Sequence, residues 1–133
     1  MKLSIFGEAG LVVSARDIVR RRLADGDRVA LVEGASGRRL SWDDVGAFVA
    51  RWESADLGTG RVGLALRDPL ALAASFLAAL ATGVTVAPVN PDAPPSELDV
   101  QARALGLDVL VTDSGIAPFA DVAIRDSDLR VLR

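Results

Sequence analysis

Residues 68–91 read DPLALAASFLAALATGVTVAPVNP, and this stretch decides the fold. Asp68 before Pro69 is typical of a helix start, because proline fits the first helical turn and lacks an N–H that would stay unpaired there. Gly83 predicts the end of that helix, since glycine favours the left-handed conformation that follows a helix. The valine-rich residues 84–89 then predict a strand. We therefore expect a helix and a strand here, and no membrane-spanning segment.

The predicted helix 69–82 is apolar on every side of its helical wheel. Its large side chains are leucines and one phenylalanine, and most of the others are alanine. A helix of this kind is buried on every side. In a single sheet with one layer of helices on each face, however, every helix keeps one solvent-exposed side. We therefore expect Leu72, Phe76 and Leu80, or the strand 84–89, to meet a second protein surface. That surface is the remainder of a larger protein or another copy of this chain.

Strand and helix signals alternate outward from this stretch. Such alternation predicts an α/β fold with a layered, largely parallel sheet and helices on both faces. No long linker divides the chain, so residues 1–133 are expected to form one partial domain, with 114–133 as its tail. The expected helices are 15–25, a second after Ser41, 69–82 and one from Pro94 to Gly106; the expected strands are 28–33, 38–40, 61–66, 84–89 and 108–112, with shorter strand-like pieces around Val122 and Val131.

Two helices are expected to begin with the same pair of residue types. Asp17 lies three positions after Ser14, and Asp44 lies three positions after Ser41. In a capping box the serine oxygen accepts a hydrogen bond from the N–H three residues on, and the acid accepts one from the serine N–H. Apolar side chains then recur at helical spacing and predict one buried stripe, formed by Val45, Phe48, Val49 and Trp52.

Several residue types that carry catalysis are scarce. The chain has no Cys, His or Tyr, and its single lysine, Lys2, lies at an end that we expect to be frayed. Disulfides, thiolate zinc sites, thiol nucleophiles and histidine bases are therefore excluded. A net charge of -3 without a basic stripe argues against a nucleic-acid partner. A mean hydropathy of +0.32 is high for 133 residues and indicates a piece of a larger protein.

The beginning of the chain does not predict export. Glu8 interrupts the apolar start before the hydrophobic region of a signal peptide could form. With no membrane span expected either, the chain is predicted to be cytoplasmic. Fourteen of the fifteen basic residues are arginine and alanine is abundant, which suggests a GC-rich bacterial genome.

Two glycine-rich loops and one basic run are the candidates for phosphate binding. Residues 7–10 (GEAG) and 34–37 (GASG) lack both the G-x-G-x-x-G spacing and the Lys-Ser/Thr pair of a nucleotide loop. The second loop lies between two strand signals, so a hairpin turn is the better interpretation. Residues 20–22 are three arginines whose side chains point in different directions on a helix. They are interpreted as a solvated C-terminal turn, which the helix dipole favours.

The acidic and aromatic candidates have structural interpretations as well. Asp43 and Asp44 could suggest a metal site, but adjacent helical residues do not face each other and helix capping explains them better. Three other acids surround the next helix start and are interpreted in the same way: Asp92, Glu97 and Asp99. Trp42 and Trp52 are predicted to be core anchors. No catalytic, cofactor-binding or metal-binding residue is therefore predicted.

The segment 40–45, LSWDDV, resembles the L-[ST]-[YW]-x-[ED]-[LV] signature near the start of adenylate-forming ligases. This superfamily comprises acyl-CoA synthetases, nonribosomal adenylation domains and luciferases. The resemblance covers residues 14–113. Further segments agree with the family in order and spacing: 28–32 (RVALV), 60–66 (GRVGLAL), 77–91 (LAALATGVTVAPVNP), 96–98 (SEL) and 108–112 (DVLVT).

The resemblance implies a reaction for the parent protein. A carboxylic acid and ATP would give an acyl-adenylate and pyrophosphate, and CoA would then form the thioester, with Mg²⁺ required. The family's ATP-binding loop with its lysine, its magnesium ligand and its late catalytic lysine have no counterpart in this chain. The stretch is therefore expected to be an N-terminal scaffold that is inactive alone, holds no cofactor itself and joins the remainder of the ligase.

Two departures from the family pattern concern the subfamily. Residues 67–68 (Arg-Asp) replace the polar Asn-type dipeptide usual after the third strand, and 85–87 (TVA) replace the commoner Ala-Tyr/Val-Val. The form PVNP at 88–91 favours acyl-CoA synthetases over amino-acid-activating domains, which more often read PLDP.

Two other functions stay open on the sequence. The first is a non-catalytic truncated module that docks on a partner protein. The second is a dinucleotide-binding domain, which fits the α/β pattern but lacks the glycine fingerprint.

Overall fold

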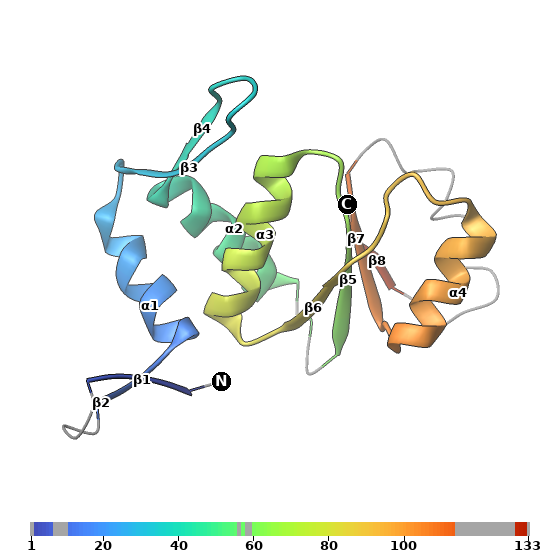
Figure 1. The fold of residues 1–133 in the computed structure, drawn as a ribbon, viewed down its shortest axis with the longest axis horizontal. Helices are drawn as coiled ribbons and strands as arrows, with labels where there is room; N and C mark the ends of the chain where they lie inside the picture. The colour runs from blue at the N-terminus through green and yellow to red at the C-terminus, as the bar shows by residue number, and fades with distance from the viewer. Residues whose placement is uncertain (1, 7–10, 56, 58–59, 114–129, 133) are drawn as a thin grey trace. The chain divides into compact units, whose positions relative to one another are not determined.

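Many helices and strands of this chain begin or end close to a serine, glycine or proline. Figure 1 shows how these elements follow one another along the chain. A computed structural model describes residues 2–6, 11–55, 57, 60–113 and 130–132. The chain divides into two compact units, residues 1–55 with 73–83 and residues 56–72 with 84–133. Helix α3 (Pro69–Thr82) therefore begins in the second unit and continues into the first.

The first unit contains two antiparallel strand pairs. Strand β1 pairs with β2, with Lys2 opposite Ser14, and β3 pairs with β4, with Val29 opposite Ser41. The predicted helix 15–25 is an α-helix that tightens into a 3-10 turn, and Gly26 follows with a positive φ of 61°. The elements are β1 (Lys2–Phe6), β2 (Leu11–Ser14), α1 (Ala15–Arg22), η2 (Leu23–Asp25), β3 (Val29–Val32), β4 (Arg39–Ser41) and α2 (Trp42–Ser54).

The hairpin β1–β2 was not predicted, and the expectation that Lys2 is frayed is wrong. Lys2 begins a strand that is paired with β2 as far as Phe6. The two strands have five and four residues, which is too short for alternation to stand out from chance. Pairing across the hairpin, rather than a pattern within either segment, makes them strands.

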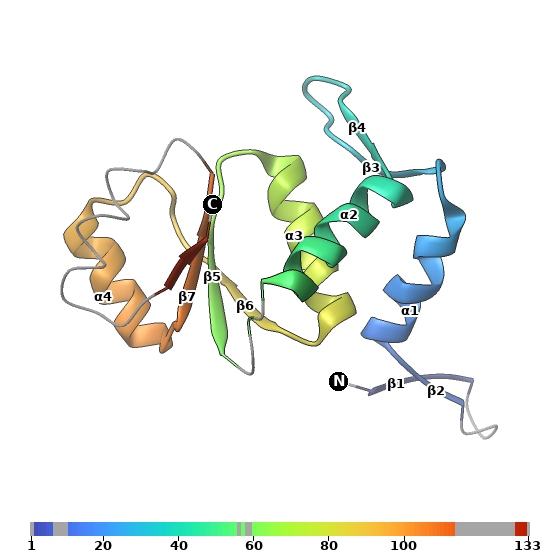
Figure 2. The same ribbon diagram turned by 180° about the vertical axis from the view of Figure 1, so that it is seen from behind.

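The second unit is built on a parallel sheet in which the described strands follow the order β6-β5-β7-β8 (Figures 1 and 2). All three neighbouring pairs are parallel, as the sequence predicted. The strand-like piece expected around Val131 is β8, while the one around Val122 lies outside the described residues. The elements are β5 (Arg61–Ala65), β6 (Thr85–Pro88), α4 (Pro95–Leu105), β7 (Val109–Thr112) and β8 (Arg130–Leu132).

The connections that follow β5 and β6 run in opposite directions across the sheet. The chain moves from β5 outward to β6 through α3, and then back across β5 to β7 through α4. Helices thus connect parallel strands, and the predicted α/β fold with a parallel sheet is confirmed.

The core of the second unit lies between α4 and the sheet. Gly63 in the central strand β5 permits the close approach, because a Cβ there would lie 2.6 Å from Leu107 Cδ1 and 3.0 Å from Leu110 Cδ1. Any other residue at this position would therefore force the leucines outward. The core cluster consists of Ala65, Val89, Leu98, Ala102 and Leu110, with Leu107 packed against it.

Helix α2 buries the stripe that its sequence predicts. Val45 and Val49 are 0% and 3% exposed, and Trp52 is 7% exposed. Phe48 is half-buried, at the border of the stripe. One face of α2 therefore supplies large side chains to the core of the first unit.

Helix α3 is not buried on every side by the described residues, and the second surface expected against Leu72, Phe76 and Leu80 stays a prediction. Its fully buried positions are small residues, including Ala74, Ser75 and Ala78, each at most 1% exposed. Phe76 is half-buried, and Leu80 is 44% exposed. The helix therefore packs by its small face, and its largest side chains are not its most buried ones.

Candidate functional site

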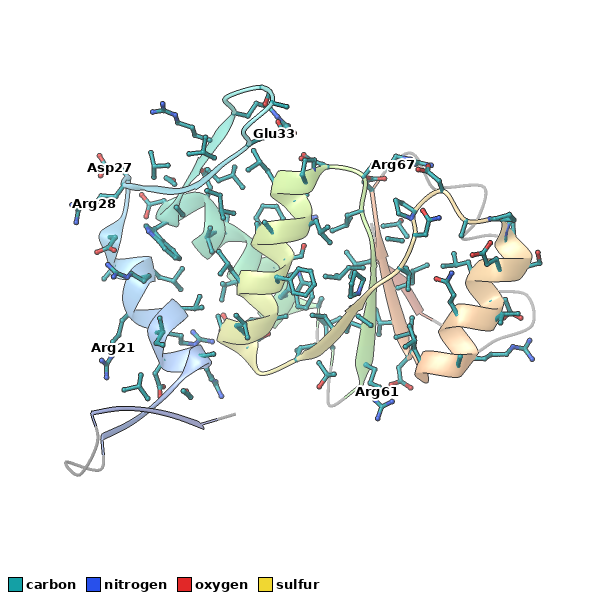
Figure 3. The ribbon with its side chains drawn as sticks, in the orientation of Figure 1. Arg21, Asp27, Arg28, Glu33, Arg61 and Arg67 are labelled. Atoms are coloured by element: carbon teal, nitrogen blue, oxygen red, sulfur yellow. The ribbon has the colours of Figure 1, made fainter. Side chains whose placement is uncertain are left out.

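The carboxyl ends of the parallel strands are the first place to look for a site, because open α/β sheets bind ligands there, where the direction of the connections changes. Arg67 follows β5, Asp92 follows β6 and Asp113 follows β7. We call these three residues the edge cluster. Figure 3 shows Arg67 at the carboxyl end of β5 and Arg61 at the opposite end.

Arg67 contacts both acids of the edge cluster. Its backbone N–H donates to Asp113 Oδ2 at 2.6 Å, and its Nε donates to Asp92 Oδ1 at 3.0 Å. Its Nη2 lies 2.8 Å from Asp92 Oδ1 and donates to the Pro91 carbonyl at 3.3 Å. One residue thus ties together the ends of β5, β6 and β7.

The positive charge of Arg67 is paired within the chain. The guanidinium lies against Asp92, with Asp113 Oδ1 at 3.9 Å from its Nη1. An anionic ligand would have to displace a carboxylate from Arg67. The Arg67–Asp92 pair is also solvent-exposed, and such a pair contributes at most about 1 kcal/mol. The arrangement is therefore suited to holding three loops in place.

The edge cluster bears on the dinucleotide-binding alternative. A nucleotide in a doubly wound sheet lies between the two neighbouring strands whose connections diverge, which here are β5 and β6. Arg67 reaches from the end of β5 to Asp92 and Pro91 after β6 across this position. Its side chain therefore occupies the place where a nucleotide would lie.

Two buried polar atoms at the same edge have no hydrogen-bond partner, Thr112 Oγ1 and Asp113 Oδ1. Thr112 is 3% exposed. Successive side chains of a strand point to opposite faces, so Thr112, the last residue of β7, shares the α4 face with Leu110. Asp113 lies just beyond the end of the strand.

Sequence reasoning missed the edge cluster. It noted Arg67 only as a departure from a family pattern and interpreted Asp92 as a helix cap. The available signal was a charged residue shortly after the end of each of three parallel strands. That signal was overlooked because Asp92 lies beside the prolines and the serine of the next helix start, and these residues suggested a helix cap instead.

The glycine-rich loop 34–37 gives no phosphate site. Residues 34–37 form the predicted hairpin turn, in which the N–H of Gly37 donates to the Glu33 carbonyl at 2.8 Å and Gly37 has a φ of 72°. The Glu33 side chain accepts hydrogen bonds from Ser36 and Arg38, which closes the turn. The loop 7–10 lies outside the described residues.

The arginine run 20–22 is only partly the solvated helix end that was predicted. Arg20 Nε donates to the Ala81 carbonyl in the last turn of α3 at 2.9 Å, and its Nη2 lies 2.6 Å from Glu53 Oε1 of α2. Arg20 therefore links three helices of the first unit. Arg22 pairs with Asp25 at 3.2 Å, and Arg21 is exposed (Figure 3).

The capping boxes are confirmed at both predicted helix starts. At α2 the Asp44 N–H donates to Ser41 Oγ at 3.1 Å, and the Ser41 N–H donates to Asp44 Oδ2 at 2.7 Å. This backbone bond, followed by the Ser41 hydroxyl, lowers the pKa of Asp44. At α1 the hydroxyl of Ser14, followed by its backbone N–H, lowers the pKa of Asp17. Asp43 is exposed in the first turn of α2, where the helix dipole favours an acid.

The capping interpretation of the acids around α4 is wrong. The N-cap of α4 is Pro94, which has no side-chain capping bond. Asp92 instead pairs with Arg67, and Glu97 accepts a hydrogen bond from Gln101 Nε2 at 3.1 Å. Asp99 pairs with Arg103 one turn later at 3.0 Å. Prolines at the N-cap and first helical positions start this helix without a side-chain capping bond, because their φ is already helical, and Glu97 is the acid of its first turn.

The remaining candidates add no site. Trp52 is the predicted core anchor, whereas Trp42 is only half-buried. Within the part of the chain that the structure describes, no group of three or more acidic side chains is placed to hold a metal ion. Among the same residues, no helix combines the length and the hydropathy needed to cross a membrane.

A curated relative matches most of this sequence, although no family model does. The chain is 36% identical over 103 residues to 4-coumarate–CoA ligase 5 of Oryza sativa subsp. japonica. The match covers 73% of this chain and 19% of the relative. The chain therefore spans about a fifth of the length of that protein.

Solved structures share the fold over nearly the whole chain. The benzoate CoA ligase from Burkholderia xenovorans has a TM-score of 0.71 and 17% identity over 90% of this chain and 25% of its own. The ATP-bound MatB from Rhodopseudomonas palustris has a TM-score of 0.69 and 19% identity over 89% of this chain and 24% of its own. At these identities the two structures establish the fold alone.

Proposed function

Because this chain has the sequence and the fold of the N-terminal portion of adenylate-forming ligases, we propose that it is a structural part of an acyl-CoA synthetase. The parent enzyme would join a carboxylate oxygen to the α-phosphorus of ATP and release pyrophosphate. The CoA sulfur would then attack the acyl carbon and release AMP. ATP and CoA would thus be substrates of the parent enzyme, and Mg²⁺ would be its cofactor. We propose that the parent enzyme acts in the cytoplasm of a bacterium.

The observation that carries this proposal is the match to a CoA ligase over 73% of the chain, combined with the chemistry of the described residues. The polar residues at the carboxyl edge of the sheet bind one another through Arg67. The sequence holds one lysine, Lys2, and no lysine-containing glycine-rich loop. The residues that bind ATP would therefore come from the remainder of the ligase, which is the proposed partner.

The alternative of a non-catalytic docking module has one observation in its favour. Leu80 is 44% exposed, as a residue of an interaction surface would be. Both proposals give this chain a structural role, and they differ in what the chain joins.

An exchange assay tests the scaffold proposal. The 133-residue chain is incubated with ATP, Mg²⁺, labelled pyrophosphate and, in turn, 4-coumarate and benzoate. No exchange above the buffer rate is expected. Exchange that a substitution in this chain abolishes would contradict the proposal.

The complete gene distinguishes the ligase proposal from the docking-module proposal. Its complete reading frame is sequenced and expressed. A frame that continues into a Ser/Thr/Gly-rich loop with lysine, and a product that exchanges pyrophosphate, would support the ligase. A frame that ends at Arg133 would support the module.

A further inference from the structure

The central strand β5 carries an arginine at each end, and the two arginines make the same kind of backbone bond. Arg61 begins β5 and Arg67 follows its end, so the two lie at opposite edges of the sheet (Figure 3). The Arg61 N–H donates to Asp108 Oδ2, just before β7, at 2.9 Å, and the Arg67 N–H donates to Asp113 Oδ2, just after β7, at 2.6 Å. Because these bonds use the backbone, a substitution of either arginine leaves them in place.

The two guanidinium groups contact the backbone on either side of α4. Arg61 Nη1 donates to the carbonyl of Leu105, the last residue of α4, at 3.1 Å. Arg67 Nη2 donates to the Pro91 carbonyl, in the loop that leads from β6 to α4, at 3.3 Å. Both arginines are solvent-exposed. The two residues are therefore a matched pair, and a purely structural role predicts similar effects when either side chain is removed.

The difference between the two arginines is that Arg67 also binds an acid of a third loop. Its Nε donates to Asp92 Oδ1 at 3.0 Å, so its side chain holds the loop after β6 while its backbone holds the residue after β7. Among the described residues Arg61 has no ion pair of this kind. Open α/β sheets bind ligands at the carboxyl ends of their strands. The additional contact of Arg67 therefore lies at the edge where a substrate is expected, and Arg61 lies at the opposite edge.

On the basis of the ligase function proposed above, we propose that Arg67 is a positioning residue of the parent enzyme. It acts through the loops after β5, β6 and β7, which it holds in the arrangement that bound substrate requires. A protein whose binding-competent arrangement is only partly populated binds its ligand more weakly by that fraction. Loss of the Arg67 guanidinium therefore raises a KM and leaves kcat unchanged, because saturating substrate restores the arrangement.

The exposure of the ion pair sets the size of the expected effect. The side chains of Arg67 and Asp92 are 39% and 72% exposed. An exposed ion pair shifts an equilibrium by at most about fivefold. Arg67→Gln, which removes the guanidinium and keeps the backbone bond to Asp113, should therefore lower the population of the held loop by about two- to fivefold. Arg61→Gln is the matched control at the other end of the same strand.

Amide hydrogen exchange tests the positioning without any activity. The Asp92 N–H donates to Asn90 Oδ1 at 3.0 Å and the Ala93 N–H donates to the Asn90 carbonyl at 3.2 Å, so both amides report on the loop after β6. In the full chain, Arg67→Gln should speed the exchange of these two amides by the factor just given, and Arg61→Gln should leave it unchanged. Equal exchange of these amides in the two variants would overturn the positioning role. Asp92→Asn, which removes the partner carboxylate, should act like Arg67→Gln and replaces it if that variant fails to fold.

Steady-state kinetics of the complete parent enzyme test the role in the reaction. The carboxylic acid that the parent activates, ATP and CoA are varied in turn. Arg67→Gln should raise the KM of at least one of them by the same factor and leave kcat unchanged, whereas Arg61→Gln should leave every KM and kcat as in the original enzyme, even where both variants lose the same melting temperature. Unchanged KM values for Arg67→Gln, or the same change in both variants, would overturn the proposal. A parent that activates no carboxylic acid would contradict the ligase function instead, and hydrogen exchange would still decide whether Arg67 positions the loops.

Discussion

Helices α2 and α3 have 13 and 14 residues, but they bury different kinds of surface. Helix α2 buries two valines and a tryptophan on one stripe and begins with a capping box. Helix α3 is far more apolar, yet its most buried positions are alanines and Ser75, and Leu80 is 44% exposed. Hydrophobicity therefore does not decide which face is buried. Helices approach more closely where the side chains at the contact are small.

Ala78→Asp should have the largest effect, because it tests the small face of α3. Ala78 is 0% exposed, and a carboxylate there would be buried without a partner. We expect a loss of about 4 kcal/mol or more in the free energy of unfolding, enough to unfold a marginal domain. Circular dichroism and urea unfolding measure this loss. Leu80→Asp, on the same helix but 44% exposed, is the control and should cost less than about 1 kcal/mol. Equal losses would show that α3 has no preferred buried face.

Trp52→Ala tests the large-residue stripe of α2. The side chain is 7% exposed, and removing it leaves a cavity in the core of the first unit. Such substitutions cost about 3–5 kcal/mol. Trp42→Ala, at a half-buried position at the start of the same helix, should cost clearly less in the same urea titration. If Trp42→Ala lowered the free energy of unfolding more than Trp52→Ala does, the face of α2 that carries Trp52 would not be the one that packs in the core.

Ser41→Ala should have a smaller effect, because it removes only the cap of α2. The Asp44 N–H then loses its acceptor, and lost caps cost about 1 kcal/mol. Ser54→Ala in the last turn is the matched control. The Ser54 hydroxyl only donates back to the Ala50 carbonyl, so its removal should be near neutral. If the two variants melt at the same temperature, the capping bond contributes nothing measurable.

The smallest expected effect is the pH dependence that the two capping boxes produce. The pKa values of Asp17 and Asp44 are lowered from an ordinary value of 3.8. The unfolded chain therefore takes up protons first as the pH falls, so the contribution of both acids is present above about pH 4 and is lost below it. Urea midpoints measured from pH 7 to pH 2.5 should fall over this range. Asp44→Asn should flatten the fall, and an unchanged slope would contradict the role of Asp44.

Elements determined by nearby residues could be predicted well. Ser14 and Ser41 cap their helices because their partners are three residues away, and Gly83 and Gly106 end α3 and α4 with positive φ angles of 76° and 62°. The parallel strands followed from the alternation of helix and strand signals. These features depend on contacts within a few residues, which are visible in a linear sequence.

Long-range polar contacts could not be predicted, even though Arg67, Asp92 and Arg20 had been noticed. Arg67 is 25 residues from Asp92 and 46 from Asp113 in the sequence. Arg20 is 61 residues from Ala81. Nothing within any one of these segments indicates its partner. Asp92 was therefore assigned to the helix start beside it, and the arginine run was treated as solvated.

The sequence by itself determined where the helices and most strands of this protein begin and end, and its signatures indicated the family. These properties are local, because caps, prolines, glycines and apolar periodicity act within one or two helical turns. Only the tertiary structure decided that α3 packs by its alanine face, that β1 and β2 form a hairpin, and that Arg67 joins the ends of three strands. Each of these features depends on which distant segments pack together. The free energy of that packing comes from residues spread over several segments, so no single stretch of sequence reveals it.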